Sequence, residues 1–310
     1  MADNAVQTSG LRKEFGHITA VDGIDLAVER GEIFGLVGPD GAGKTTTMRM
    51  LCGIMQPTSG HAIVAGFDVR TQPEEVKLRI GYMSQRFSLY TDLTVAENIE
   101  FFADLHSVPK RDRPQRREEL LGFSRLTSFT KRLVGNLSGG MKQKLALVCT
   151  LMHTPEILFL DEPTTGVDPV SRRDFWKILY SLVGQGVTLI VSTPYMDEAE
   201  RCNRVAMIDR GRIIECDDPD RLKTKMQGDL FEIICAPQQE AKRILTALAG
   251  VLGVQVFGER LHVWVEDAAR VRPLAESALQ SAGITVDHMR AITPSLEDVF
   301  VSVVAARPGR

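Results

Sequence analysis

The chain has 310 residues, more than one typical domain, so we expect one large domain and a smaller appendage. Its formal net charge of −3 and its pI of about 6.1 argue against a nonspecific nucleic-acid binder, and we expect no nucleic-acid partner. Its five cysteines form no CxxC pair and indicate neither a zinc site nor a disulfide framework.

Residues 1–10 are polar and lack the apolar core of a signal peptide. No apolar run reaches the roughly 18 residues that a membrane span needs. We therefore expect a cytoplasmic chain.

The first predicted strand, 33–37, precedes a glycine-rich turn and a helix over 44–54. Further short apolar runs alternate with helix-like stretches, which is the pattern of a parallel α/β sheet. These runs are 157–160, 187–192 and 205–208, with a helix over 171–183. The sheet is expected to end near Cys216, inside a first domain that spans 1–227.

A different pattern occupies about 90–150. Between 94 and 129, apolar residues recur at helical spacing and predict a helical subdomain. The stretch 110–117 is basic, with Lys110, Arg111, Arg113, Arg116 and Arg117. It is either a solvated helix face or a surface that contacts a partner or lipid headgroups.

A predicted linking helix over 219–227 ends at Gly228, and a second domain follows over 228–310. Strands and helices are predicted there in the order βαββαβ. The strands are 230–235, 254–257, 261–265 and 285–290, and the helices are 238–249 and 268–281. This order suggests a small ferredoxin-like α+β domain.

The segment from Gly38 to Thr45 matches the pattern GxxxxGK[ST], between a predicted strand and a predicted helix, as a phosphate-binding loop requires. Its glycines let backbone N–H groups converge on phosphate oxygens at a helix N-terminus. Lys44 would bridge the outer phosphates, and the Thr45 hydroxyl would ligate Mg²⁺. We therefore predict binding of ATP and Mg²⁺ by Gly38, Pro39, Asp40, Gly41, Ala42, Gly43, Lys44, Thr45 and Thr46.

The apolar strand over 157–160 ends in two carboxylates, Asp161 and Glu162, at the sheet edge where the phosphates would lie. Asp161 can hold Mg²⁺ through its water shell. Glu162 is then free to orient and deprotonate the attacking water, because a metal-bound carboxylate would be a poor base.

Residues 137–143, Leu-Ser-Gly-Gly-Met-Lys-Gln, resemble the signature sequence of ATP-binding cassette (ABC) ATPases, shortly before Asp161 as in that family. Ser138, Gly139 and Gly140 precede a helix and form a second anion-binding helix start. The resemblance implies a P-loop ABC cassette with a mixed sheet and a helical signature subdomain. It also implies that two cassettes pair head to tail, each signature capping the γ-phosphate that the other's loop holds.

Three further residues match positions of that family. Gln85 resembles the glutamine that contacts Mg²⁺ and the attacking water. Asp168 resembles the residue of the loop through which the partner cassettes communicate. Phe15 stands where the family has an aromatic that stacks on adenine; the alternative is a core phenylalanine.

Two residues depart from the family pattern. Asp40 replaces the commoner asparagine and adds a negative charge near the phosphates, which is expected to weaken binding modestly. Pro194 stands where the family usually has a histidine that hydrogen-bonds the γ-phosphate and helps to position Glu162. Proline has no donor, so we predict slow hydrolysis or a pairing with a different cassette.

Residues 294–300, Pro-Ser-Leu-Glu-Asp-Val-Phe, resemble the closing motif of ATPase subunits from daunorubicin-resistance-type multidrug exporters. The resemblance implies an ATP-hydrolysing subunit at the inner face of the cell membrane. It would drive separate integral membrane permease subunits for drug or lipid-like efflux, and it would pair with a second ABC ATPase, identical or different.

The segment 86–106 is expected to form the groove that receives the permease's cytoplasmic helix. Phe87, Leu89 and Tyr90 would be apolar contacts there or ordinary core residues. Two other functions stay open: a non-transport ABC ATPase, and a catalytically weak regulatory partner. The single cassette without heptads or a long insertion disfavours the first, and the intact Glu162 disfavours the second.

Overall fold

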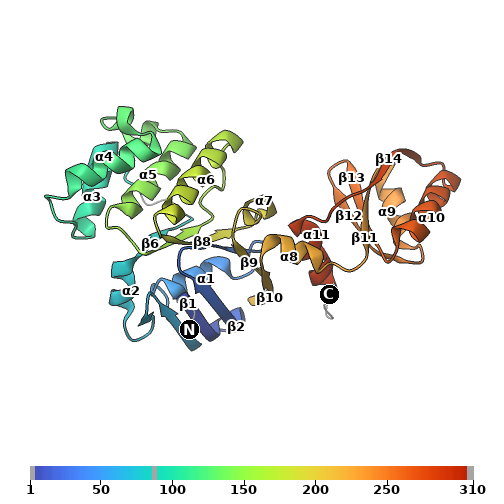
Figure 1. Cartoon of the computed structure of the whole chain (residues 1–310), viewed down its shortest axis with the longest axis horizontal. Coiled ribbons are helices and arrows are strands. Elements are labelled where there is room, and N and C mark those ends of the chain that lie inside the picture. The colour runs from blue at the N-terminus through green and yellow to red at the C-terminus, as the bar shows by residue number, and fades with distance from the viewer. Residues whose placement is uncertain (1–3, 86–88, 306–310) are drawn as a thin grey trace. The chain divides into compact units, whose positions relative to one another are not determined.

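The computed structural model describes residues 4–85 and 89–305, and the chain divides into two compact units, Met1–Asp217 and Asp218–Arg310 (Figure 1). The division falls before the predicted linking helix rather than after it. Within the described residues, no helix is long and apolar enough to cross a membrane.

A six-stranded sheet forms the centre of the first unit, in the order β10-β9-β3-β8-β7-β6. Its strands pair in parallel except for the antiparallel pair at the β10 edge. Strands β3 and β7 are buried along their whole length, as strands of a sheet covered on both faces should be. The strands are β3 (Ile33–Val37), β6 (Ile80–Met83), β7 (Ile157–Asp161), β8 (Thr188–Thr193), β9 (Arg204–Asp209) and β10 (Arg212–Asp217).

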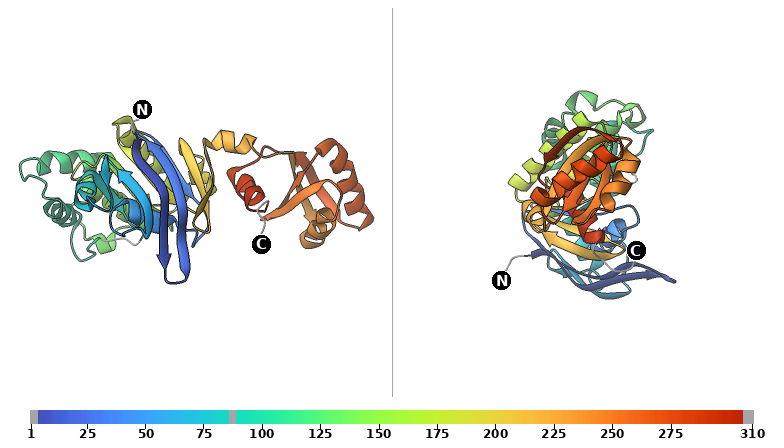
Figure 2. Two further views of the ribbon diagram at one scale, coloured as in Figure 1. Left: turned by 90° about the horizontal axis from the view of Figure 1, so that it is seen from below. Right: turned by 90° about the vertical axis from the view of Figure 1, so that its right-hand side faces the viewer.

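A second, antiparallel sheet of the first unit has the order β2-β1-β4-β5. Its two long strands form a hairpin that Figure 2 shows in blue. The strands are β1 (Asn4–Phe15), β2 (Ile18–Glu29), β4 (Ser59–Val64) and β5 (Phe67–Asp68). Helix α1 (Lys44–Leu51) contacts strands of both sheets, and its Met48 belongs to the buried cluster they share. The two sheets therefore enclose the helix that follows the phosphate-loop sequence.

Helices make up the predicted subdomain between β6 and β7. Thr94 and Glu97 form a capping box that begins α3, and Ser138 caps α5. The helices pack around a cluster of apolar side chains that includes Ile99 and Leu145. They are α3 (Val95–Leu105), α4 (Arg113–Ser124), two short 3₁₀ turns over 127–129 and 134–136, and α5 (Gly139–Leu151).

One residue of the basic stretch 110–117, Arg113, makes buried contacts inside this subdomain. Arg113 is buried and donates to the carbonyl of Val108 at 2.9 Å. It also pairs with Glu100 and Asp104. These contacts give Arg113 a structural role and remove it from the surface that could meet lipid headgroups.

Three helices complete the first unit: α2 (Pro73–Arg79), α6 (Pro169–Gly184) and α7 (Met196–Ala199). Asp168 caps α6, and the long apolar side chains of α6, among them Phe175 and Trp176, are buried. The mixed sheet, the helical subdomain and the order of elements confirm the predicted α/β cassette.

The second unit has the predicted βαββαβ order and a four-stranded antiparallel sheet, β12-β13-β11-β14. This strand order confirms the ferredoxin-like prediction. Helices α9 and α10 contact the sheet around a core that includes Phe231 and Leu261. The elements are α8 (Pro219–Thr224), β11 (Asp229–Ala236), α9 (Gln238–Thr246), β12 (Val251–Phe257), β13 (Arg260–Val265), α10 (Ala268–Ser281), β14 (Thr285–Ala291) and α11 (Leu296–Ala305).

Helix α11 contains most of the closing motif and is fixed by polar contacts. Asp298 accepts hydrogen bonds from the backbone N–H and the hydroxyl of Ser295, at 2.9 and 2.6 Å. Its other oxygen lies 2.7 Å from Nδ1 of His262 on β13. Burial would raise the pKa of Asp298, but the bonds from His262 and Ser295 outweigh it and lower the pKa.

Candidate functional site: a nucleotide site at the carboxyl ends of the parallel strands

The phosphate-loop residues 38–43 connect β3 to α1 and lie against neighbouring backbone. A Cβ on Gly38 would approach the carbonyl oxygen of Ile208 to 2.1 Å. Gly43 has φ +106°, and a Cβ there would lie 2.4 Å from the carbonyl oxygen of Ala20. Only glycine fits at these two positions, so the structure explains why the loop needs them.

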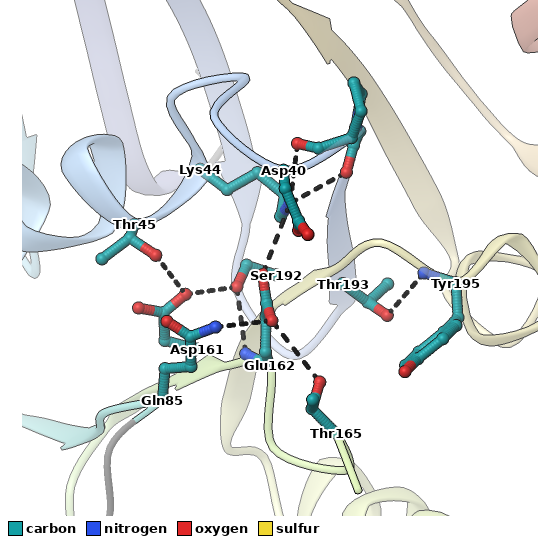
Figure 3. A network of polar contacts seen from close by, with 12 residues as sticks. Asp40, Lys44, Thr45, Gln85, Asp161, Glu162, Thr165, Ser192, Thr193 and Tyr195 are labelled. Carbon is teal, nitrogen blue, oxygen red and sulfur yellow. Dashed lines mark hydrogen bonds and ion pairs between the residues drawn. The ribbon is translucent and has the colours of Figure 1, made fainter.

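Lys44 begins α1 and turns its amine into the loop. Its Nζ donates to the carbonyls of Gly38 and Pro39 at 2.8 and 3.0 Å, and it lies 3.4 Å from Oε1 of Glu162 (Figure 3). The Lys44 side chain is buried, whereas the Asp40 side chain is 92% exposed. Oδ1 of Asp40 lies 4.0 Å from Nζ of Lys44. The loop thus pairs a buried cation with an exposed anion.

Thr45 and Asp161 meet between α1 and β7. The Thr45 hydroxyl donates to Oδ1 of Asp161 at 3.1 Å, and Ser192 donates to the same oxygen at 2.5 Å. The phenol of Tyr82 donates to Oδ2 at 3.3 Å. Burial and the nearby Asp161 raise the pKa of Tyr82, so its phenol keeps its proton. Asp161 is fully buried at the strand end.

Glu162 is buried and held from several sides. Its backbone has φ +50°, unusual for a residue with a side chain, and its N–H donates to the carbonyl and the hydroxyl of Ser192, both at 3.1 Å. Oε2 accepts from Nε2 of Gln85 at 2.8 Å and from the hydroxyl of Thr165 at 3.4 Å. These bonds orient the carboxylate toward the amine of Lys44.

The site residues predicted from the sequence do not include Ser192 and Tyr82. Ser192 is the register partner of Asp161 on the neighbouring strand, so its position follows from strand order, which the sequence does not state. A signal was present, because polar residues that follow apolar strands, such as Ser192 after 187–191, gather at one sheet edge in parallel sheets.

Two predicted nucleotide-binding groups lie outside this network. Ser138 accepts from the N–H of Met141 at 3.4 Å, and a Cβ on Gly140 would meet Cβ of Ser171 on α6 at 2.6 Å. Asp168 accepts from the N–H groups of Val170 and Ser171, at 3.1 and 2.9 Å. Hydrogen bonds, above all from the Ser171 side chain, lower the pKa of Asp168. The signature and the Asp168 loop therefore pack together at α6.

Phe15 ends β1 and is 47% exposed, so it is not a core residue. Nζ of Lys13 lies 5.2 Å from the centre of its ring. An exposed aromatic face of this kind is open to stacking by a flat ring.

A small pocket of about 80 Å³ lies between β6 and the helical subdomain, at the segment for which a permease groove is predicted. Leu89 lines it together with Phe102 of α3 and Cys149 of α5. Tyr90 is 45% exposed and contacts Phe101 edge to face, with ring centres 4.7 Å apart. Phe87 lies outside the described residues.

Comparisons with known proteins agree with this geometry. The model of the family "ABC transporter" matches residues 21–165, and the model "ATP-binding protein DrrA1-3-like, C-terminal domain" matches residues 218–304. A solved structure titled as the ATP-binding subunit of an ABC transporter superposes with a TM-score of 0.65 at 26% identity, over 71% of this chain and 92% of that one.

Curated relatives extend the match to both units. The daunorubicin resistance ATP-binding protein DrrA2 of Streptomyces coeruleorubidus is 40% identical, over 98% of this chain and 96% of its own length. The Nod factor export ATP-binding protein I of Cupriavidus metallidurans is 36% identical, over 96% of each chain.

The probable multidrug ABC transporter ATP-binding protein YbhF of Escherichia coli is 44% identical over 73% of this chain, which spans only 39% of YbhF. The chain therefore belongs to the ATP-binding subunits of ABC transporters, in the group of ABC ATPases that carry a DrrA-like C-terminal domain.

Proposed function

We propose that this chain binds ATP with Mg²⁺, hydrolyses it with Glu162 as the general base, and so drives export by separate membrane subunits. The observation that carries the proposal is the position of Glu162, which is buried beside the phosphate loop. Its carboxylate is bonded to Gln85 and lies 3.4 Å from Lys44. A carboxylate fixed in this way can accept a proton from a water molecule at the end of a bound phosphate chain.

Mg²⁺ suits the oxygen donors at this site. The Thr45 hydroxyl and the buried carboxylate of Asp161 lie 3.1 Å apart, and Gln85 donates through Nε2, which leaves its Oε1 for a ligand. Mg²⁺ prefers such hard oxygen ligands and keeps several waters. When bound, the ion would neutralise charge on the phosphate oxygens.

Other side chains of this chain would bind the phosphates, position the carboxylates and accept the proton. Lys44 would exchange its hydrogen bonds to the carbonyls of Gly38 and Pro39 for phosphate oxygens, because its amine already lies within the loop. Ser192 holds Asp161 and Glu162 together through its hydroxyl. Glu162 accepts the proton of the attacking water, and Gln85 keeps that carboxylate oriented.

We infer that Ser138, Gly139, Gly140 and Asp168 act on the nucleotide of a second cassette. In this chain Ser138 and Asp168 accept hydrogen bonds from backbone N–H groups at the starts of α5 and α6. Among the described contacts, none of these four residues forms a hydrogen bond with Lys44, Asp161 or Glu162. Both helix starts present N–H groups that suit an anion. Phe15 would stack on the adenine of the nucleotide in its own chain. The second cassette can be an identical or a different chain.

The proposed coupling to transport rests on the small pocket between β6 and the helical subdomain. Leu89 and Phe102 give this pocket an apolar lining, and the exposed ring of Tyr90 lies next to α3. A pocket of this size has room for one apolar side chain from the face of an amphipathic permease helix. The chain would then lie at the inner face of the membrane through its permease. The relatives named above are resistance and export ATP-binding proteins, which favours drugs or lipid-like molecules as cargo.

Phosphate release by the purified chain tests the hydrolysis proposal, with Glu162→Gln as the blank. We expect the wild-type rate to exceed the blank by about 100-fold or more, since general-base catalysis contributes factors of that order. Equal rates would refute hydrolysis and leave an ATP-binding partner, the function that Pro194 favours. Co-purification from membranes, followed by identification of the attached subunits, tests the permease and the second ATPase.

A further inference from the structure

Glu198 is a fully buried carboxylate in α7, shortly after Pro194. The Thr164 hydroxyl donates to its Oε1, and the Thr193 hydroxyl donates to its Oε2 at 2.8 Å. Nε of Arg172 on α6 lies 3.5 Å from Oε1. A buried charge is costly unless it is paired and hydrogen-bonded, so these three partners fix where the carboxylate lies. One side chain thereby links the loop after β7, the start of α6 and the end of β8.

Two of the linked segments hold the proposed general base. Thr164 is followed by Thr165, whose hydroxyl donates to Oε2 of Glu162 at 3.4 Å. Thr193 is preceded by Ser192, which binds the N–H of Glu162 at 3.1 Å. Movement of either threonine would therefore displace a direct partner of Glu162.

The third segment is the start of α6. The N–H of Arg172 donates to the carbonyl of Asp168 at 2.9 Å, and its guanidinium lies 4.7 Å from the ring centre of Tyr195. The same helix start contains Ser171, which packs against Gly140 of the signature. Glu198 thus also holds the surface that we assign to the second cassette.

Because residue 194 is proline, the loop after β8 depends more strongly on the hydrogen bonds of Thr193 and Glu198. Proline offers no N–H, so the loop after β8 is held by the residues on either side of it. The Thr193 hydroxyl accepts from the N–H of Tyr195 at 3.0 Å (Figure 3). The same hydroxyl donates to Glu198. The position of the loop therefore depends on Thr193 and Glu198, on both sides of a residue that contributes no donor.

We propose that Glu198 is a positioning residue for hydrolysis, which sets the orientation of Glu162 through Thr164 and Thr193. This inference rests on the function proposed above. Glu198 does not touch the nucleotide. It holds the loop after β7 and the loop after β8 at the spacing that Glu162 needs, and Arg172 extends the same link to the loop of Asp168.

The first test replaces Glu198 by glutamine in the full-length chain and measures kcat, KM for ATP and nucleotide affinity. We expect kcat to fall about 10- to 100-fold, because a displacement of a catalytic group by an ångström has effects of this size. KM and the affinity for a fluorescent ATP analogue should change less than about three-fold, since the described hydrogen bonds and ion pair of the Glu198 carboxylate go to Thr164, Thr193 and Arg172 rather than to the phosphate loop.

A matched control is available in the same helix. Asp197 also pairs with Arg172, at 3.6 Å, but its side chain is 63% exposed. Exposed pairs contribute little, so Asp197→Asn should leave kcat within about two-fold of wild type. An equal loss in Asp197→Asn would show that charge near Arg172 matters rather than the buried link.

The hydroxyl partners provide a second route that avoids a buried charge change. Thr164→Val and Thr193→Val should each lower kcat, whereas Thr164→Ser and Thr193→Ser should restore it because serine keeps the donor. These variants decide the question if Glu198→Gln does not fold. A Glu162→Gln background should abolish the effect of Glu198→Gln, since a residue that acts through Glu162 has nothing left to position.

Besides an equal loss in Asp197→Asn, three outcomes would overturn the inference. A folded Glu198→Gln chain with full kcat would do so, as would a loss of nucleotide affinity in parallel with kcat and Tm, which indicates a purely structural role. Serine variants as slow as the valine variants would also contradict it. A wild-type rate equal to that of Glu162→Gln is a separate result, because it refutes hydrolysis itself.

Discussion

Replacing Pro194 with histidine is expected to raise the rate of ATP hydrolysis. The exchange should leave the loop in place, because the loop is held by the hydrogen bonds of Thr193 and Glu198 rather than by the proline ring. Strand β8 ends at Thr193, so residue 194 carries no strand hydrogen bond that the exchange would alter. The added imidazole supplies a donor that proline lacks.

The magnitude follows from one added hydrogen bond to a charged group. Such a bond contributes about 1.5–3 kcal/mol net, and about 1.4 kcal/mol corresponds to a tenfold change in rate. If the bond forms fully in the transition state, kcat should rise between about 10- and 150-fold. Histidine loses side-chain freedom on ordering, so we expect a value near the lower end.

Phosphate release under saturating ATP is the assay, with Pro194→Ala as the control. Alanine removes the ring and adds no side-chain donor, so its rate should stay within about two-fold of wild type. A rate for Pro194→His that is unchanged or lower would refute the account based on a missing hydrogen bond. A rise in Pro194→Ala equal to that in Pro194→His would assign the effect to the backbone instead.

Three further predictions concern the loop, the signature and the second unit. Gly140→Ala should lower the free energy of unfolding by about 1–3 kcal/mol in urea titrations, because its Cβ would overlap a side chain of α6, whereas Gly139→Ala has open space and should not. Asp40→Asn should tighten ATP binding by about two- to five-fold in equilibrium titrations, and salt should shrink the difference, since Asp40 is exposed. The lowered pKa of Asp298 stabilises the fold above pH 3.8, the ordinary value, and this stability is lost as the pH falls through the lower folded-state value. Asp298→Asn should reduce the loss of folding stability at acid pH, which unfolding followed by the fluorescence of Trp264 in the same unit would measure.

The phosphate loop shows how far a sequence can predict a site. The spacing from Gly38 to Thr45 gives the turn, the lysine and the hydroxyl together, and the structure places them between β3 and α1 as that pattern requires. Asp161 and Glu162 follow for a similar reason, because an apolar run that ends in two carboxylates identifies its own strand end. Local patterns of this kind need no knowledge of the neighbouring strands.

The antiparallel sheet and the hydrogen-bond partners of Asp161 could not be predicted from local sequence patterns, because both depend on which strands lie side by side. Strands β1 and β2 contain many exposed polar residues and irregular register, so they give no continuous apolar run. Their pairing depends on tertiary contacts more than on propensity. Ser192 and Tyr82 reach Asp161 because β8 and β6 flank β7, an order that no local pattern contains.

Pro194 shows why a departure from a motif has to be judged in its surroundings. Considered alone, a proline at a position where a donor is usual suggests a damaged site. In the structure the hydroxyl of Thr193 accepts on one side and donates on the other, and the buried Glu198 completes the link to Thr164. The loop therefore keeps its position without residue 194. We therefore expect the proline to cost a single hydrogen bond to the phosphate, which would lower the rate of hydrolysis while Glu162 stays in place.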